Sequence, residues 1–380
     1  MISITSQFDS GNIEVLDASD PSGIRLRIRR DAGEEHAQWF HFQVANARNR
    51  ELKMTIENAS EMSYPEGFEN YRACASVDGD YWFRVPTEYD GKQLVIRHEP
   101  PADQVFYAYF APYSFERHQW LIAGASESPL VRSETLCNTP DGRALTLLTI
   151  SDPAAAARDE ARTKIWITAR QHPGESMAEW WVEGFLDRLL NPEDGVARAL
   201  LRKAVVYLVP NMNPDGSVRG HLRVNARGVN LNRAWRDPDP DDSPEVYYVR
   251  ERMHEVGVDL AMDVHGDEGL PYNFIAGGEG VKRWNEEMQA ELDAFKDLLA
   301  RICPDFQTEH GYDVDAPGSA DLRKCTDYIA ETFGCLSMTL EMPFKDADNL
   351  PLPDVGWSPE RCRNLGAQCL DAFWQTIAER

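Results

Sequence analysis

The 380-residue sequence predicts an antiparallel β-sandwich followed by an α/β domain. Up to about residue 110, apolar and polar residues alternate with a period of two, which is typical of strands with one buried face. Beyond Tyr113 the pattern changes to short apolar strands separated by longer helical stretches, which favours a largely parallel sheet. A chain of this length has room for two domains, and we place them at residues 1–112 and 113–380.

The N-terminal domain is predicted from three alternating runs, at residues 24–29, 40–44 and 52–57. In the first run Leu26 lies between Arg25 and Arg27, so we expect one side of each strand to face water. Clusters of Asp, Gly, Ser and Pro separate such runs and mark turns. Prolines up to Pro112 indicate where this unit ends.

The α/β domain is predicted from four short apolar strands, at residues 165–168, 205–209, 260–264 and 337–340. Each strand runs directly into polar side chains that could take part in chemistry. In open α/β sheets, ligands bind beyond the carboxyl ends of the strands. We therefore expect a mixed, largely parallel sheet flanked by helices, with one shared site at that edge.

Composition excludes several classes of protein. The chain has 39 Lys and Arg against 63 Asp and Glu, a net charge of −24, which opposes binding to nucleic acid phosphates. Mean hydropathy is −0.49, and no apolar run approaches the roughly 20 residues of a membrane span. The N-terminus lacks the features of a secretory signal, so we expect a cytoplasmic protein. The seven scattered cysteines contain no Cys-x-x-Cys pair and are expected to be reduced thiols.

The first strand of the α/β domain leads into a turn with His172 and Glu175, followed by a helix. We expect Ser176 and Glu179 to form a capping box at the start of that helix. An imidazole and a carboxylate three residues apart can bind one cation. A His-x-x-Glu pair is also expected by chance in a chain of this composition, and alone it equally fits a capped helix with a surface histidine.

A second signal is His265, which follows the strand at 260–264 and lies 90 residues after Glu175. Two histidines and a glutamate leave one position of a zinc tetrahedron open, which is the arrangement of a catalytic zinc. A lone histidine there would more often be a satisfied core residue. Together the two motifs predict one Zn²⁺ per chain.

Two further segments carry candidate residues. The Asn-Pro-Asp-Gly run at 213–216 precedes a segment with Arg223, Asn232 and Arg233. That segment fits a solvated basic loop, but guanidinium groups near a zinc site can also bind a carboxylate bidentately and stabilise an oxyanion. Glu341 ends a strand that otherwise reads as fully buried, and a carboxylate there is costly unless it has a function or a partner.

These motifs, in this order, resemble the zinc metallocarboxypeptidases over roughly residues 165–345, and with the β-rich N-terminal unit they look most like the bacterial cytosolic carboxypeptidases. The resemblance implies an α/β carboxypeptidase domain and an enzyme that removes the C-terminal residue of a peptide or protein. The implied roles are zinc ligands His172, Glu175 and His265; Arg223 for the scissile carbonyl; Asn232 and Arg233 for the terminal carboxylate; and Glu341 as general base.

One position departs from the family pattern. Where the family usually has an Asp that supports a zinc-binding histidine, this chain has Asn230. An amide can accept the same N–H but adds no negative charge, which can weaken metal affinity or activity roughly 10–100-fold. The mobile tyrosine of the family has no motif here, and Tyr312 and Tyr328 are both candidates.

Three functions remain open from the sequence. The first is the carboxypeptidase, the second a zinc amidohydrolase of N-acyl amino acids, and the third a metal-binding protein without activity. The cytosolic resemblance implies a preference for acidic C-terminal residues. The wall of the specificity pocket would lie near Thr326, where Arg323 or Lys324 could pair with an acidic side chain, although both also fit solvated charges. The N-terminal unit is either a structural cap or an assembly surface for a homo-oligomer.

Overall fold

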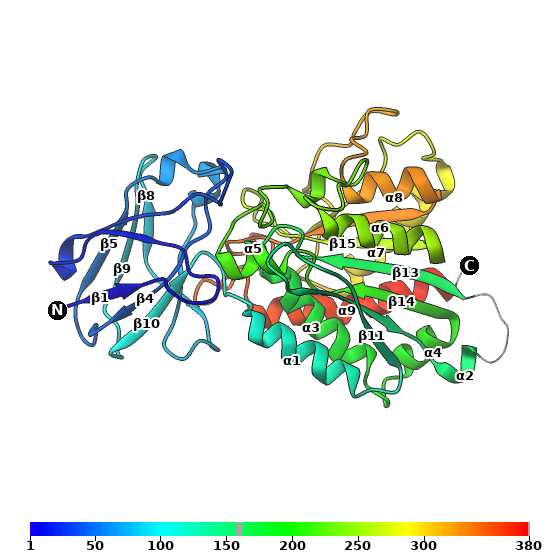
Figure 1. The fold of residues 1–380 in the computed structure, drawn as a ribbon, viewed down its shortest axis with the longest axis horizontal. Helices are drawn as coiled ribbons and strands as arrows, with labels where there is room; N and C mark the ends of the chain where they lie inside the picture. The colour runs from blue at the N-terminus through cyan, green and yellow to red at the C-terminus, as the bar shows by residue number, and fades with distance from the viewer. Residues whose placement is uncertain (157–161, 379–380) are drawn as a thin grey trace.

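The computed structural model describes residues 1–156 and 162–378. The chain forms two domains that lie end to end, with the two termini at opposite ends of the molecule (Figure 1). Strand β10 of the first domain ends at Ala108, and helix α1 of the second begins at Phe115. These bounds are compatible with a division near residue 112, which stays a prediction.

Two five-stranded sheets make up the N-terminal domain. The first has the order β1 (Ser3–Thr5), β4 (His41–Ala45), β10 (Gln104–Ala108), β6 (Cys74–Ser76) and β7 (Phe83–Arg84). The second has the order β2 (Glu14–Asp17), β3 (Ile24–Arg27), β5 (Leu52–Ile56), β9 (Leu94–His98) and β8 (Thr87–Tyr89). One pair, β3 and β5, departs from the antiparallel pattern and is parallel. After β3 the chain crosses to the other sheet, where it forms β4. It then returns to the second sheet, so that β5 runs in the same direction as β3.

The predicted alternation of these strands agrees with their burial. In β3, Ile24 and Leu26 are fully buried while Arg25 and Arg27 are exposed. His41 differs from the expectation that each run has a wet face. It is 7% exposed because aromatic rings surround it, with the Phe8 ring edge-to-face at 4.9 Å between centroids, and burial lowers its pKa to about 3.

The second domain is built on a seven-stranded sheet. Its order is β11 (Val131–Asn138), β12 (Ala144–Ile150), β14 (Ala204–Val209), β13 (Thr163–Ala169), β15 (Leu260–Val264), β17 (Leu336–Glu341) and β16 (Phe274–Gly277). The four central strands β14, β13, β15 and β17 are parallel, and the pairs outside them are antiparallel. These four contain the four predicted strands, so the mixed sheet is confirmed.

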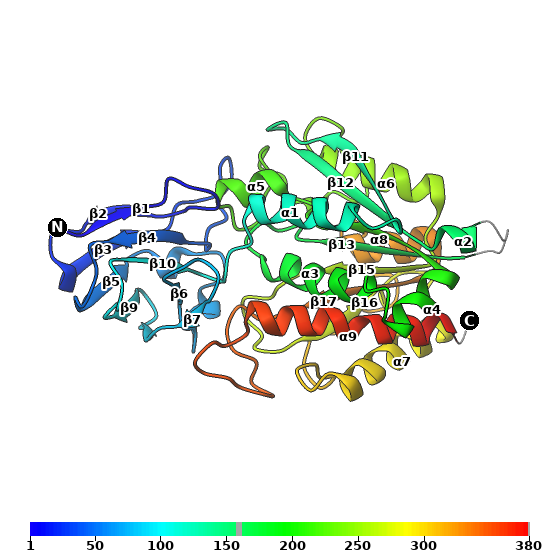
Figure 2. The same cartoon turned by 90° about the horizontal axis from the view of Figure 1, so that it is seen from below.

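Helices cover both faces of this sheet. They are α1 (Phe115–Ser126), α2 (Pro153–Ala156), α3 (Met177–Leu189), α4 (Gly195–Lys203), α5 (Pro214–Arg219), α6 (Pro244–Val256), α7 (Glu286–Ile302), α8 (Cys325–Phe333) and α9 (Pro359–Ala378). The short 3-10 helices η1 (Pro21–Gly23), η2 (Ala59–Glu61) and η3 (Pro65–Phe68) belong to the N-terminal domain, and η4 (Leu231–Arg233) belongs to the second. In Figures 1 and 2, α3, α4, α7 and α9 lie on one face and α6 and α8 on the other.

Side chains of β13 show why both faces are covered. Ile165 and Ile167 belong to the core beneath α3 and α9, whereas Trp166 belongs to the core beneath α6 and α8. A strand buried on both sides reads as a continuous apolar run. Within the described residues, no helix combines the length and the apolar character needed to cross a bilayer.

Candidate active site

The turn between β13 and α3 presents His172 and Glu175 at the carboxyl edge of the sheet. Arg170 begins this turn in the left-handed region, with φ 55°. Its buried guanidinium donates to the Pro173 carbonyl at 2.9 Å and to the Glu179 carboxylate at 2.5 Å. A buried ion pair with further hydrogen bonds of this kind holds the turn in one conformation.

The predicted capping box between Ser176 and Glu179 is not formed, so that prediction is wrong. The Ser176 hydroxyl donates instead to the Ala111 carbonyl at 2.9 Å. The fully buried Glu179 carboxylate lies 2.7 Å from His118 Nδ1 and accepts from Asn211 at 2.8 Å. A buried carboxylate needs such partners, and here tertiary contacts replace the local cap.

His172, Glu175 and His265 converge beyond the ends of β13 and β15. His172 Nδ1 lies 2.7 Å from Glu175 Oε1, and His265 Nδ1 lies 2.7 Å from Glu175 Oε2. One ligand atom from each residue lies within 4.8 Å of the others, and all three side chains are buried. The two Nδ1 atoms and the carboxylate therefore face a common point.

The outer ring nitrogens of the two histidines are held by different partners. Asn230 Oδ1 lies 3.1 Å from His172 Nε2, which is the amide contact expected from the sequence. Asp263 Oδ2 lies 2.6 Å from His265 Nε2. Burial lowers the pKa of His172 to about 4, so its imidazole is neutral. Burial also lowers the pKa of His265, but Asp263 and Glu175 outweigh it and raise the pKa well above its ordinary value.

This donor set fits Zn²⁺. Two imidazole nitrogens and one carboxylate are the ligands of several catalytic zinc sites, which keep a fourth position open. Hydrogen bonds to the outer nitrogens orient the rings, as is common for metal-binding histidines. The carboxylates around His265 favour a cation at this position.

Arg223 lies between α5 and η4 and is partly buried. Its guanidinium carbon lies 5.6 Å from the ring centroid of Tyr64, a residue of the N-terminal domain. Within residues 1–156 and 162–378, no hydrogen bond or ion pair involves the Arg223 guanidinium. Its donors are therefore free to bind a substrate oxygen.

Asn232 and Arg233 lie on η4. Asn232 Oδ1 accepts from the Cys325 amide at 2.8 Å, which leaves its Nδ2 group, 3.4 Å from His265 Nε2, as the donor. Burial lowers the pKa of Arg233, and the nearby Arg223 guanidinium lowers it further. Two cations close enough to affect each other favour an anionic ligand between them.

Glu341 ends β17 and is 7% exposed. Its Oε1 lies 3.1 Å from the Tyr312 hydroxyl, which also lies 2.7 Å from Asp267 Oδ2. Glu341 Oε2 is buried and has no hydrogen-bond partner in the described part of the chain. Burial raises the pKa of Glu341 well above its ordinary value. Of the two candidate tyrosines, Tyr312 reaches the site, whereas the Tyr328 hydroxyl lies 2.8 Å from His254.

One cavity of about 690 Å³ contains all the predicted site residues. They are His172, Glu175, Arg223, Asn232, Arg233, His265 and Glu341. Thr326 and Lys324 also line it. Arg323 does not, because its guanidinium pairs with Asp321 at 2.7 Å.

Sequence reasoning missed several lining residues. Tyr64 and Glu66 come from the N-terminal domain, and Lys296 comes from α7. None of them belongs to a motif, and nothing in the sequence places a loop of the first domain beside the second. Asp267 and Glu268, which the sequence places beside His265, line the cavity as well.

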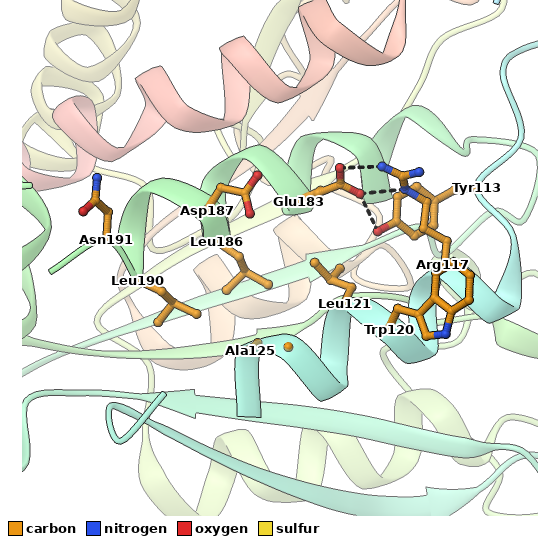
Figure 3. A pocket seen from close by; sticks show the side chains of 11 residues that line it. Tyr113, Arg117, Trp120, Leu121, Ala125, Glu183, Leu186, Asp187, Leu190 and Asn191 are labelled. Carbon is orange, nitrogen blue, oxygen red and sulfur yellow. Dashed lines mark hydrogen bonds and ion pairs between the residues drawn. The ribbon is translucent and has the colours of Figure 1, made fainter. Parts of the chain in front are cut away.

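A second cavity, of about 500 Å³, lies between α1 and α3 (Figure 3). Apolar side chains such as Leu121 and Leu186 line it, and an ion pair of Arg117 and Glu183 at 2.8 Å closes one end. None of the predicted site residues is among those that line it. The predicted site residues therefore lie together in the cavity at the carboxyl edge of the sheet.

A comparison with protein families agrees with this fold and site. The model of the zinc carboxypeptidase family matches residues 118–364, and that of the cytosolic carboxypeptidase N-terminal domain matches residues 4–110. The chain therefore belongs to the zinc carboxypeptidase family, which makes it a metallo-carboxypeptidase with Zn²⁺ as its cofactor.

Individual relatives include bacterial and human proteins. A metallo-carboxypeptidase of Burkholderia cenocepacia is 47% identical, with a TM-score of 0.97 over 100% of both chains. A metallo-carboxypeptidase of Pseudomonas aeruginosa, in complex with (2-guanidinoethylmercapto)succinic acid, is 43% identical, with a TM-score of 0.95 over 99% of both chains. Human cytosolic carboxypeptidase 2 is 29% identical over 97% of this chain, which spans only 44% of that longer protein.

Proposed function

We propose that this protein hydrolyses the C-terminal peptide bond of peptides or proteins. One observation carries the proposal: three buried metal-type ligands, a buried carboxylate and the guanidinium groups of Arg223 and Arg233 line a single cavity, although Arg233 also donates to the Asn232 carbonyl at 2.6 Å. The proposed roles are zinc ligands His172, Glu175 and His265; general base Glu341; carbonyl contact Arg223; and carboxylate contacts Asn232 and Arg233.

When bound, Zn²⁺ supplies Lewis acidity towards water and carbonyl oxygens. The protein supplies the proton transfer through Glu341. Its Oε2 atom has no partner in the described residues and can take a proton from water, while Oε1 lies 3.1 Å from the Tyr312 hydroxyl. Glu341 then returns that proton to the leaving amine.

Arg223 and Arg233 divide the recognition of substrate oxygens. The Arg223 donors face the cavity beside the metal ligands and would stabilise negative charge on the scissile carbonyl oxygen. Arg233 and the Asn232 amide would bind the free terminal carboxylate. A peptide held in this way is cut one residue from its end.

The test compares one peptide in two forms, with a free C-terminal carboxylate and with a C-terminal amide. We expect release of the terminal residue from the free acid only. Equal rates would contradict the carboxylate contacts. Cleavage restricted to N-acyl amino acids would identify an amidohydrolase, and bound Zn²⁺ without release of any amino acid would identify a binding protein.

Specificity for an acidic C-terminal residue is the finer part of the proposal. Lys324 and Lys296 both line the cavity. Lys324 Nζ stays 3.9 Å from Asp315 and 4.0 Å from Asp327, distances too long for strong hydrogen bonds. Either ammonium group could pair with a substrate carboxylate.

A second candidate, a basic C-terminal residue, is favoured by Asp327. Its Oδ2 atom is buried without a hydrogen-bond partner in the described residues, and burial raises its pKa to about 6. Glu279 lines the same cavity. The Pseudomonas relative, in turn, binds a ligand whose name contains a guanidino group and a succinic acid.

A peptide series that differs only in the C-terminal residue decides between them. Acidic specificity predicts fastest release of Glu or Asp, and Lys324→Ala should then slow Glu about tenfold without slowing Leu. Fastest release of Arg or Lys, slowed instead in Asp327→Asn, would establish the second candidate. Fastest release of Leu or Phe would exclude both.

We also propose a cytoplasmic location and, for the N-terminal domain, a role either as a structural cap or as the surface of a homo-oligomer. Fractionation of cells and light scattering of the purified protein test these two statements.

A further inference from the structure

The N-terminal domain contacts the loop that carries Arg223. Helix α5 and this loop lie at the edge of the second domain that faces the sandwich (Figure 1). The Ser10 amide donates to the Val218 carbonyl at 2.9 Å, and Asn12 Nδ2 donates to the Gly220 carbonyl at 2.9 Å. The loop is thus tied to the other domain just before Arg223.

Asp31 makes three hydrogen bonds to the same loop. Its carboxylate accepts three successive backbone amides, from Leu222 at 2.7 Å, Arg223 at 2.7 Å and Val224 at 3.1 Å. Asp31 is 3% exposed, so these bonds form away from water. Hydrogen bonds to an ionised acceptor are about twice as strong as neutral ones.

His221 adds a second tie at the same place. The Ala32 amide donates to His221 Nε2 at 3.1 Å, which leaves the proton on Nδ1, and Nδ1 donates to the Val224 carbonyl at 3.0 Å. The chain from 221 to 224 is therefore fixed from both of its sides.

Tyr64 acts on the side chain of Arg223. Its ring lies against the guanidinium, with 5.6 Å between Cζ and the ring centroid. The fully buried Gln38 fixes the Tyr64 backbone, because its side chain accepts from the Tyr64 amide and donates to the Tyr64 carbonyl, both at 2.8 Å. A cation over an aromatic face is attracted to the ring, so the contact restrains the position of the Arg223 guanidinium.

We infer that the N-terminal domain is a positioning part of the active site, in which Asp31 fixes the backbone of Arg223 and Tyr64 fixes its guanidinium. The inference rests on the proposed role of Arg223 at the scissile carbonyl. It differs from a structural cap, because a cap would affect folding without affecting Arg223 in particular. Errors of about 1 Å in the placement of such a group can cost about 100-fold in rate.

The chain offers a matched control for Asp31. Asp9 is also in the N-terminal domain, and its carboxylate accepts a backbone amide of the second domain, that of Phe115 at 2.6 Å. Phe115 begins α1 and does not line the cavity. Asp9→Asn therefore removes charge from the same kind of contact, and within the described residues the Asp9 side chain bonds none of the amides of residues 222–224.

The first measurement is hydrogen exchange on the full-length, zinc-loaded protein, and it needs no substrate. In Asp31→Asn, we expect the amides of residues 222–224 to exchange about tenfold faster or more, since the loss of a charged acceptor weakens three hydrogen bonds. Asp9→Asn should leave these amides unchanged. Unchanged exchange in Asp31→Asn would overturn the inference.

The second measurement is a double-mutant cycle with Arg223→Ala on a free-acid peptide. Asp31→Asn should lower kcat about tenfold or more while KM changes about twofold at most, because a carbonyl contact strengthens in the transition state. In the Arg223→Ala background the same change should lower kcat less than about twofold. An equal loss in both backgrounds would mean that Asp31 acts on the fold alone.

Tyr64 provides a test that does not depend on a buried carboxylate. Tyr64→Leu removes the ring and should lower kcat, again only when Arg223 is present. A Leu variant as active as the parent would overturn the role of Tyr64. If the parent releases no amino acid from any peptide, the proposed function is wrong. Hydrogen exchange then still tests whether Asp31 fixes the backbone of residues 222–224.

Discussion

The two histidines of the site have outer partners of different charge. His265 is supported by the Asp263 carboxylate and His172 by the neutral Asn230 amide. A carboxylate makes the opposite ring nitrogen a more basic ligand than an amide does. The His172 side of the site is thus the weaker one.

Substitution of Asn230 should change zinc affinity in both directions. Asn230→Asp is expected to tighten zinc binding, and Asn230→Ala to weaken it roughly 10–100-fold. Competition with a chelator of known affinity measures both. Asn349→Ala, at an exposed asparagine, is the control. Equal affinities in all four proteins would show that Asn230 does not support the ligand.

Glu341 should be dispensable for metal binding and required for turnover. Glu341→Gln keeps the shape and the acceptor for the Tyr312 hydroxyl but removes the base, so kcat should fall about 100-fold or more. Zinc content, measured by mass spectrometry, should stay at one per chain. A variant with kcat within tenfold of the parent would refute the general-base role.

Among the helices, α6 carries an unusual carboxyl group. Glu245, in its first turn, is fully buried, and its carboxylate accepts from Asn225 Nδ2 at 3.2 Å. Burial raises its pKa to about 7 from an ordinary value of 4.5. Between these values the folded chain keeps a proton that the unfolded chain has lost, so the free energy of unfolding falls as pH rises through this window.

Glu245→Gln should remove this dependence, because the amide stays neutral. The melting temperature of the variant relative to the parent should therefore rise by a few degrees between pH 5 and pH 8. Glu251→Gln, on the exposed side of the same helix, is the control. A difference between variant and parent that stays constant with pH would contradict the raised pKa.

The two domains share one continuous apolar core. At their boundary, Tyr109 and Phe344 stack with 4.6 Å between ring centroids. The buried Arg84 of the first domain donates to the carbonyls of Phe344 at 2.8 Å and Trp357 at 3.1 Å. Contacts of this kind couple the stability of the two domains.

Calorimetry of the full chain should therefore show a single unfolding transition. Arg84→Met leaves buried carbonyls without a donor and should lower stability by roughly 3 kcal/mol. Arg48→Met, at an exposed ion pair with Asp103 inside the first domain, should change it little. Two separate transitions in the parent would contradict the coupling.

The positions of the four central strands and the metal motif follow from local patterns. Apolar runs at 165–168 and 260–264 predict buried strands because period and composition act over a few residues. Topology then places the residue after each strand at the carboxyl edge of the sheet, which is why His172 and His265 could be expected to meet.

Contacts between distant segments could not be predicted in this way. Asp31 binds amides about 190 residues away, and neither partner has a pattern that depends on the other. Three other observations have the same origin. The side-chain cap at Ser176 is missing, Lys324 and not Arg323 lines the cavity, and β3 pairs with β5 in parallel. The spacing of residues along the chain determines local structure, that is, strands, turns and short motifs. Packing of the two domains determines which distant side chains lie around Arg223.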